Sequence, residues 1–203
     1  MGLLRNAFGP SRHEVWQRLS DEIGATYLPA QGWKGDRIDA HHGQWVVTLD
    51  SYHVMVGRVP MPCTRMRAPY VNPDRFRFCV YRRSWAADVA KWFGSQDVEI
   101  GDAQFDREFI VKGTDEGKLR ALFADEHLRQ LLMDQPEIRL EVRDHEGFFG
   151  PTFPPDTDEL VFELGGEIRD VERLKGLFEI FAETLSQLCR IGSAYEQDPG
   201  IRL

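Results

Sequence analysis

The stretch DVEIGDAQFDREFIVKGTDEGKLRALF, residues Asp97 to Phe123, has the clearest pattern of local structure in the chain. The apolar residues between Phe105 and Val111 predict the core of a strand, which Gly113 ends. The polar run Thr114-Asp115-Glu116 then predicts the start of a helix. The apolar side of that helix would carry Leu119, Leu122 and Phe123. The stretch therefore predicts a strand followed directly by a helix, and the remaining elements are assigned around it.

This stretch lies where the charge of the chain changes sign. Residues 1–96 contain 13 Lys and Arg against 8 Asp and Glu, whereas residues 97–203 contain 12 against 25. The whole chain has a formal net charge of −8, which disfavours nucleic acid as a partner because phosphates repel an acidic protein. Opposite charges on the two halves favour head-to-tail or two-fold association. A homo-oligomer is therefore one expectation.

The size and composition of the chain predict one domain. It has 203 residues, of which 42% are hydrophobic, enough for a core that needs no disulfide or metal. Residues 1–203 are thus expected to form a single domain with a basic, β-rich part (1–96) and an acidic strand–helix part (97–203). Three dispersed cysteines, Cys63, Cys79 and Cys189, predict reduced thiols and a cytoplasmic location. No window suggests a signal peptide or a membrane span.

Before the quoted stretch, one helix precedes several strands. Residues Ser11 to Glu14 form a capping-box pattern that predicts a helix ending at Gly24. Period-two alternation then predicts strands near residues 37–41, 44–49, 52–59, 64–70 and 75–81. The expected turns lie at His42-Gly43 and at Asn72-Pro73-Asp74, and a short helix is expected at 85–93.

After the quoted stretch, Asp125 is expected to cap a helix over 126–133, and residues 138–142 and 160–164 are expected strands. Asp170 should begin the longest helix, which reaches about Ile191 and has a broad apolar stripe. This order predicts an α+β fold. Its expected architecture is an antiparallel β-sheet meander packed against a long C-terminal helix, with a short capped N-terminal helix.

Seven arginines but only one acidic residue occur between residues 58 and 83. Alternation along a strand places arginines two residues apart on one face. If strands 64–70 and 75–81 pair, four guanidinium groups would share one surface with aromatic rings nearby, which suits a protein partner or a small anionic ligand. This candidate surface consists of Arg65, Arg67, Arg75, Arg77 and Tyr81. Alternatively, the arginines face solvent or pair with carboxylates of the same chain.

A second polar group lies near residues 36–53 and combines carboxylates with imidazoles, the ligand types that a divalent metal needs. Its members are Asp36, Asp39, His41, His42, Asp50 and His53. A metal-assisted hydrolase could use Asp39, His41, Asp50 and His53. Neighbouring His41 and His42 point to opposite faces of a strand, however, and no HxH or HExxH spacing occurs. Histidines at the surface near a turn are the favoured interpretation.

The chain contains no GxSxG, GxGxxG or GxxxxGK motif, so no catalytic nucleophile and no cofactor is indicated. The favoured function is a non-catalytic cytosolic binding or regulatory protein that uses its arginine-rich face for an anionic partner or for self-association. The alternative function is the metal-assisted hydrolase.

Two stretches resemble a broad group of uncharacterised bacterial proteins. The first is WQRLSDEIGATY, from Trp16 to Tyr27, and the second runs from Phe105 to Leu132 with the pattern FDxxFxVxG followed by LRxLF and LRQLL. The group has no assigned activity, so the resemblance implies neither catalytic residues nor a cofactor. Some members look tethered to a membrane by an N-terminal apolar segment, a pattern that this chain does not show.

Overall fold

The protein is an eight-stranded sheet with helices. The computed structural model describes residues 10–30, 35–85, 97–144, 153–201 and 203. The helices are α1 (Arg12–Ile23), α2 (Ala103–Glu108), α3 (Glu116–Leu122), α4 (Glu126–Asp134) and α5 (Val171–Arg190), with a short 3-10 helix at Arg83–Trp85. The strands are β1 (Thr26–Leu28), β2 (Arg37–His42), β3 (Trp45–Val56), β4 (Val59–Val71), β5 (Phe78–Arg82), β6 (Phe109–Gly113), β7 (Arg139–Arg143) and β8 (Thr157–Gly165).

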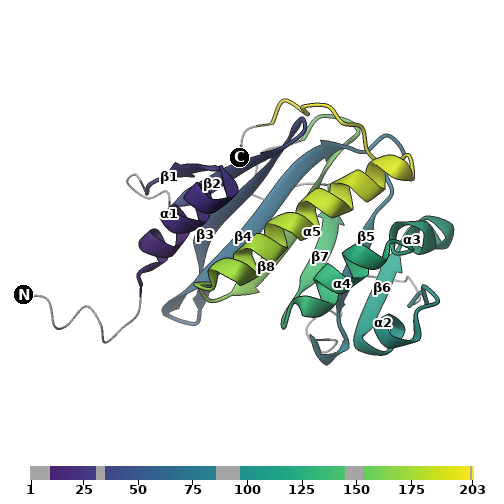
Figure 1. Cartoon of the computed structure of the whole chain (residues 1–203), viewed down its shortest axis with the longest axis horizontal. Coiled ribbons are helices and arrows are strands. Elements are labelled where there is room, and N and C mark those ends of the chain that lie inside the picture. Colours follow the sequence, from purple (N-terminus) through teal and green to yellow (C-terminus); the bar gives the residue numbers. More distant parts are fainter. Residues whose placement is uncertain (1–9, 31–34, 86–96, 145–152, 202) are drawn as a thin grey trace, which may run out of the picture.

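All neighbouring strands run antiparallel, in the order β1-β2-β3-β4-β8-β7-β5-β6 (Figure 1). Strands β2, β3 and β4 form part of the predicted meander, β1 adds an unpredicted strand at its edge, and the predicted strand 75–81 lies apart from it as β5. The hairpin β7–β8 then inserts between β4 and β5, although these strands come late in the chain. The predicted α+β class, the capped N-terminal helix and the long C-terminal helix are confirmed.

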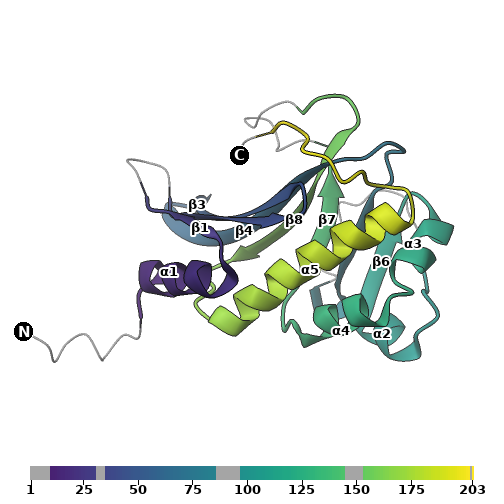
Figure 2. The same ribbon diagram turned by 45° about the horizontal axis from the view of Figure 1, so that its top comes forward.

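Helices α1 and α5 lie along the same face of the sheet (Figure 2). On that face, one row of fully buried apolar side chains crosses seven strands in direct register. The row consists of Ile38, Leu49, Met66, Phe162, Leu140, Val80 and Val111, none more than 2% exposed. These strands therefore share one hydrophobic core with the helices.

The predicted helix signals act as the sequence suggests. Ser11 accepts a hydrogen bond from the Glu14 amide, and the Glu14 carboxylate accepts one from the Ser11 amide. Gly24 ends α1 with a left-handed φ of 66°, a conformation that costs glycine little. Asp170 accepts from the Arg173 amide at 3.1 Å and begins α5. In the part of the chain that the structure describes, no helix is both long enough and apolar enough to span a membrane.

The strand predicted within the opening stretch begins later than expected. Phe105 lies in α2, whose N-cap is Asp102, and the strand β6 starts only at Phe109. The Asp102 side chain accepts from the amides of Gln104 and Phe105, which favours a helical turn. The Phe105 ring then stacks on Phe109 with centroids 4.5 Å apart. The prediction was wrong because aromatic residues suit either element and the local cap decides between them.

Three other predicted boundaries change. The predicted strands 44–49 and 52–59 are not separate, because β3 is continuous over Trp45–Val56. After a turn at Gly57-Arg58, β4 begins at Val59, earlier than the predicted strand 64–70, and includes Pro60 and Pro62. The predicted strand 75–81 begins only at Phe78, since Arg75 has a left-handed φ of 59°. The predicted helix at 85–93 lies outside the described residues apart from Trp85, which ends the 3-10 helix.

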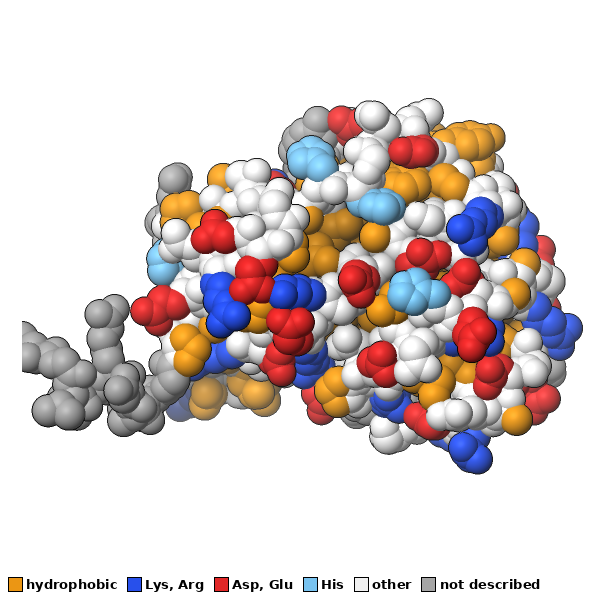
Figure 3. Space-filling view, viewed as in Figure 1, with side chains coloured by type: hydrophobic (Ala, Val, Ile, Leu, Met, Phe, Trp, Pro, Cys, Tyr) orange, Lys and Arg blue, Asp and Glu red, His pale blue; other side chains and the backbone are white. Residues whose placement is uncertain are grey.

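The two halves of opposite charge do not form separate poles. Because β7 and β8 belong to the acidic half and insert beside β4, carboxylates lie next to basic residues of the first half. Arg77 pairs with Asp158 at 3.3 Å, and Arg82 pairs with Glu108 at 2.9 Å. Acidic and basic side chains also mix over the face seen in Figure 3. Association through opposite charge poles therefore has no structural basis.

Helix α5 should contribute much of the stability, and Phe181 tests this because its side chain is fully buried in the core. We expect Phe181→Ala to lower the free energy of unfolding by about 3–5 kcal/mol, since it removes buried apolar area and leaves a cavity. Chemical denaturation measures this change. The control is Glu179→Ala at an exposed position of the same helix, with an expected change within about 0.5 kcal/mol. A loss below about 1 kcal/mol for Phe181→Ala would contradict the assignment.

Candidate functional site

The second face of the sheet, opposite α1 and α5, carries many charged side chains. Arg37, Asp50, Arg65 and Glu163 lie directly opposite one another across β2, β3, β4 and β8. Arg139, Glu141 and Arg143 alternate along β7 on the same face. We call these residues, together with Asp39 and Arg67, the charged face.

Asp50 organises the centre of the charged face. Its carboxylate accepts two hydrogen bonds from Arg65, at 2.8 and 2.7 Å, and one from Arg67 at 2.8 Å. Arg67 is only 4% exposed, and Arg65 lies over the ring of Tyr52 at 4.8 Å. A buried guanidinium is stable only when it is paired. These two arginines therefore serve the fold first and are not open to an anionic ligand.

The other three residues of the predicted arginine surface lie elsewhere. Strands β4 and β5 do not pair, because β8 and β7 separate them. Arg77 pairs with Asp144 at 2.9 Å and with Asp158, whereas Arg75 is exposed on the turn before β5. Tyr81 is buried on β5. Because the two strands do not pair, the four guanidinium groups do not share one surface.

The Asp and His residues near residues 36–53 are also dispersed. Asp39 accepts hydrogen bonds from Arg37 and Thr48, and Asp36 accepts from Arg12, Tyr27 and the Ala30 amide. His41 and His53 are exposed, and His42 stacks on Trp45 instead. Within the described ranges, no three His, Cys, Asp or Glu side chains are grouped so that they could hold a metal ion. The geometry of these residues therefore lends the hydrolase alternative no support.

A cluster that resembles catalytic machinery joins the turn before β5 to the end of α5. Ser193 donates to Asp74 at 2.9 Å, and Lys118 donates to Ser193 at 3.1 Å and also to Asp74. Ser193 has no exposed surface, however. Lys118 is held by its ion pair with Asp74. The cluster links three segments of the fold and does not form an active site.

Two carboxylates of the charged face, Asp50 and Glu141, each have two arginine partners. Glu141 is the more buried of the two. It accepts from Arg139 at 2.8 Å and from Arg143 at 2.6 Å, and Arg143 continues to Glu163 at 2.9 Å. Burial disfavours the ionised form of Glu141. The attraction of Arg143 and Arg139 outweighs burial and holds the pKa of Glu141 below its ordinary value. Ion pairs on the charged face thus join β3 to β4 and β8 to β7.

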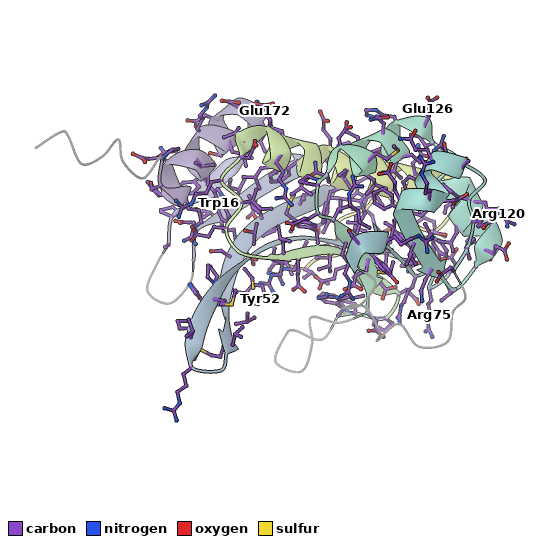
Figure 4. All side chains as sticks on the ribbon, turned by 90° about the horizontal axis from the view of Figure 1, so that it is seen from below. Trp16, Tyr52, Arg75, Arg120, Glu126 and Glu172 are labelled. Atoms are coloured by element: carbon purple, nitrogen blue, oxygen red, sulfur yellow. The ribbon has the colours of Figure 1, made fainter. Side chains whose placement is uncertain are left out.

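The most exposed apolar feature is the far end of the β3–β4 hairpin. Strand β2 pairs with β3 only as far as Asp50, and β8 pairs with β4 only from Thr64 onward. Most of residues 51–63, which we call the arm, therefore extends beyond the sheet as a two-stranded ribbon, while Pro62 and Cys63 at its base still contact Gly166. Figure 4 shows the arm pointing away from the helices, with Tyr52 near its base.

One face of the arm carries an apolar strip. Val56 lies opposite Val59, and Val54 lies opposite Met61, so these four side chains share a face. Their exposed fractions are 57%, 62%, 36% and 42% in that order. Alternation places the strip on the same side of the sheet as Asp50 and Arg65. An apolar strip that continues from a charged face suits the core and rim of a protein-binding surface.

Sequence reasoning treated residues 52–59 as an ordinary strand and missed the strip. The available signal was the run VMVGRVPM at residues 54–61, which is apolar at successive positions on both sides of a Gly-Arg turn. A strand with one wet face alternates instead. Apolar residues on both faces of a strand predict burial within a core. Only the structure shows that the neighbouring strands end before the arm, so that nothing in the described chain covers these side chains.

Comparison with known proteins identifies no similar protein. No protein-family model, curated protein or solved structure matches the chain. The resemblance to uncharacterised bacterial proteins stays a prediction. Function must therefore be argued from the surface itself.

Removing the carboxylate at the centre of the charged face should be costly. We expect Asp50→Asn to lower the free energy of unfolding by about 3–5 kcal/mol, because it removes the carboxylate that binds both Arg65 and the buried Arg67. Urea unfolding measures the change. The control is Asp156→Asn at an exposed site 3.9 Å from Arg75, where the loss should stay below about 1 kcal/mol. Equal effects of the two substitutions would show that Asp50 is not needed for stability.

The depressed pKa of Glu141 makes stability depend on pH. Because its pKa is lower in the folded chain than the ordinary value of 4.5, ionised Glu141 contributes stability above that value, and the contribution is lost as pH falls through the folded pKa. We expect the free energy of unfolding to fall less steeply with acid in Glu141→Gln than in the wild type. Denaturation at a series of pH values from neutral to acid measures both slopes. Glu137→Gln, at an exposed side chain, should retain the wild-type slope. Parallel curves for wild type and Glu141→Gln would contradict the prediction.

Proposed function

We propose that this protein is a non-catalytic binding protein that recognises another polypeptide through the apolar strip of its arm. The observation that carries the proposal is the exposure of four large apolar side chains on one face of a projecting two-stranded ribbon. Exposed apolar area is unfavourable in water, at about 25 cal/mol per Å². A contiguous strip of this kind is typical of a surface that another chain covers.

The shape of the surface favours a polypeptide over a small molecule. Small-molecule sites are concave and enclose most of the ligand, whereas the arm projects from the body of the protein (Figure 4). A flat ribbon with an apolar face instead matches the way proteins dock on one another, with an apolar centre and a polar rim. Asp50 and Arg65 at the base of the strip supply that rim.

The charged face supports the arm and holds it in place. Arg65 bonds Asp50 on β3 and covers Tyr52 at the base of the arm, while the Tyr52 hydroxyl donates to Glu163 on β8 at 3.3 Å. These contacts fix the base of the ribbon to three strands of the sheet. An anionic ligand would have to displace Asp50 from Arg65 and Arg67. We therefore propose that these arginines contribute to binding by holding the arm in position.

The cysteines support a reducing compartment for this function. Cys63, Cys79 and Cys189 are all free thiols, and burial raises the pKa of Cys79 to about 12, which makes that thiol unreactive. Free cysteines suit the cytosol. We therefore place the binding function there.

Site-specific photo-crosslinking in the native host tests the proposal. A photoreactive residue at Met61, which is 42% exposed on the strip, should capture a discrete polypeptide product. Val56→Thr with Val59→Thr keeps the β-branched shape but removes apolar contact, and should lower the yield about tenfold. Both positions are exposed, so the double variant should fold as stably as the wild type, which thermal unfolding checks.

The matched control carries the photoreactive residue at Glu126, which is exposed on α4 on the opposite side of the molecule (Figure 4). It should not give the product obtained at Met61. If Met61 gives no product beyond the Glu126 background, or if the two threonines leave the yield unchanged, the strip is not a binding surface.

A further inference from the structure

Two methionines of the arm are highly exposed for apolar residues. Met55 is 65% exposed and Met61 is 42% exposed, whereas Met66, on the same strand as Met61, is fully buried. Met133 on α4 is half-buried. Methionine sulfur is oxidised most readily where it is accessible to solvent. In the part of the chain that the structure describes, the arm therefore carries the two methionines most accessible to an oxidant.

The two methionines lie on opposite faces of the ribbon. Met61 lies opposite Val54 across the hairpin and belongs to the apolar strip, whereas Met55 lies opposite Pro60. Because side chains alternate along a strand, Met55 points to the other face, as His53 does. Only Met61 of the two contributes to the proposed binding surface. Met55 is thus a matched reference of the same residue type in the same hairpin.

Met61 occupies the middle of the apolar strip. Toward the tip of the arm, its next neighbour on the same face is Val59, and toward the base it is Cys63, which lies opposite Tyr52. Val59 is 62% exposed, whereas Cys63 is buried. A partner that follows the strip from its exposed tip to its covered base must therefore cross the side chain of Met61.

Oxidation of Met61 changes the chemical character of the strip at this point. Hydrogen peroxide transfers one oxygen atom to Sδ of Met61. The O–O bond breaks, an S–O bond forms, the sulfur loses two electrons and the peroxide is reduced to water. The resulting sulfoxide is polar. A partner that covers it with apolar surface separates its oxygen from water, which is unfavourable unless a new hydrogen bond forms.

We propose that Met61 is an oxidation-sensitive modification site that controls binding by the arm. With the reduced thioether the partner binds, and with the sulfoxide it is released. This proposal rests on the proposed binding function and names its regulation. The modification is reversible, because methionine sulfoxide reductases remove the oxygen as water while two of their thiols form a disulfide.

Photo-crosslinking from Val59 tests the proposal while Met61 stays intact. Purified protein with the photoreactive residue at Val59 is treated with hydrogen peroxide, freed of it and added to an extract of the host. Peptide mass mapping should find sulfoxide at Met61 and Met55 but not at Met66. The yield of the polypeptide product should fall at least about fivefold, and methionine sulfoxide reductases should restore it. Thermal unfolding should be unchanged, because both oxidised side chains are exposed.

Two substitutions separate Met61 from the other groups that peroxide oxidises. Met61→Leu keeps an apolar side chain of similar volume, so its yield should be the same before and after peroxide. Met55→Leu should lose its yield as the wild type does, because Met61 is still present. Both variants retain Cys63, Cys79 and Cys189, so oxidation of these thiols affects them equally.

A second pair of variants needs no oxidant. Met61→Gln places a polar amide where the sulfoxide would lie and should lower the yield at least about fivefold without peroxide. Met55→Gln should keep the yield within about twofold of the wild type. The proposal is overturned by equal effects of the two glutamines, by a Met61→Leu variant that loses its yield after peroxide, or by an oxidised wild type that keeps it. A lower unfolding temperature after oxidation also overturns it, since the damage then lies in the fold.

Failure of this proposal is distinguishable from failure of the proposed function. A product at Val59 whose yield does not depend on the oxidation of Met61 overturns the regulation alone and leaves the binding function intact. Absence of any product at Val59 above the Glu126 background overturns the binding function and, with it, the regulation.

Discussion

The fold depends on one row of apolar side chains that crosses the sheet in direct register. From Ile38 on β2 to Val111 on β6, each strand supplies one fully buried residue on the face that α1 and α5 cover. The contact of Met66 with Phe162 matters most, because the β4–β8 pair joins the N-terminal meander to the rest of the sheet. Helix α5 can cover a continuous surface only because this register holds.

The charged face follows from the same register. When one side of each strand is used for the core, the alternate residues necessarily meet on the other side. Arginines of β4 then lie beside carboxylates of β3 and β8, and arginines of β7 flank Glu141. Because several of these groups are buried, they are stable only as pairs. Arg65, Arg67 and Arg77 of the basic segment thus bind carboxylates within the fold.

The arm shows what happens where this arrangement ends. Beyond Asp50 and Thr64 no strand in the described part of the chain lies beside the hairpin, so apolar residues that would belong to a core remain exposed. The tie between Arg65, Asp50 and Tyr52 fixes the base of the ribbon to the sheet. The arm therefore combines a stable base with an exposed apolar end.

The sequence by itself determined the α+β class, the first meander, the caps at Ser11, Asp125 and Asp170, and the apolar stripe of α5, because these features depend on local propensity and periodicity. It did not place Phe105 correctly, since an aromatic residue fits a helix or a strand and the cap at Asp102 decides. Only the tertiary structure separated β4 from β5 and set Arg65 and Arg67 on Asp50. It also left the strip of the arm uncovered. Which strands become neighbours depends on contacts between residues far apart in the chain, such as Met66 with Phe162, and no local pattern records them.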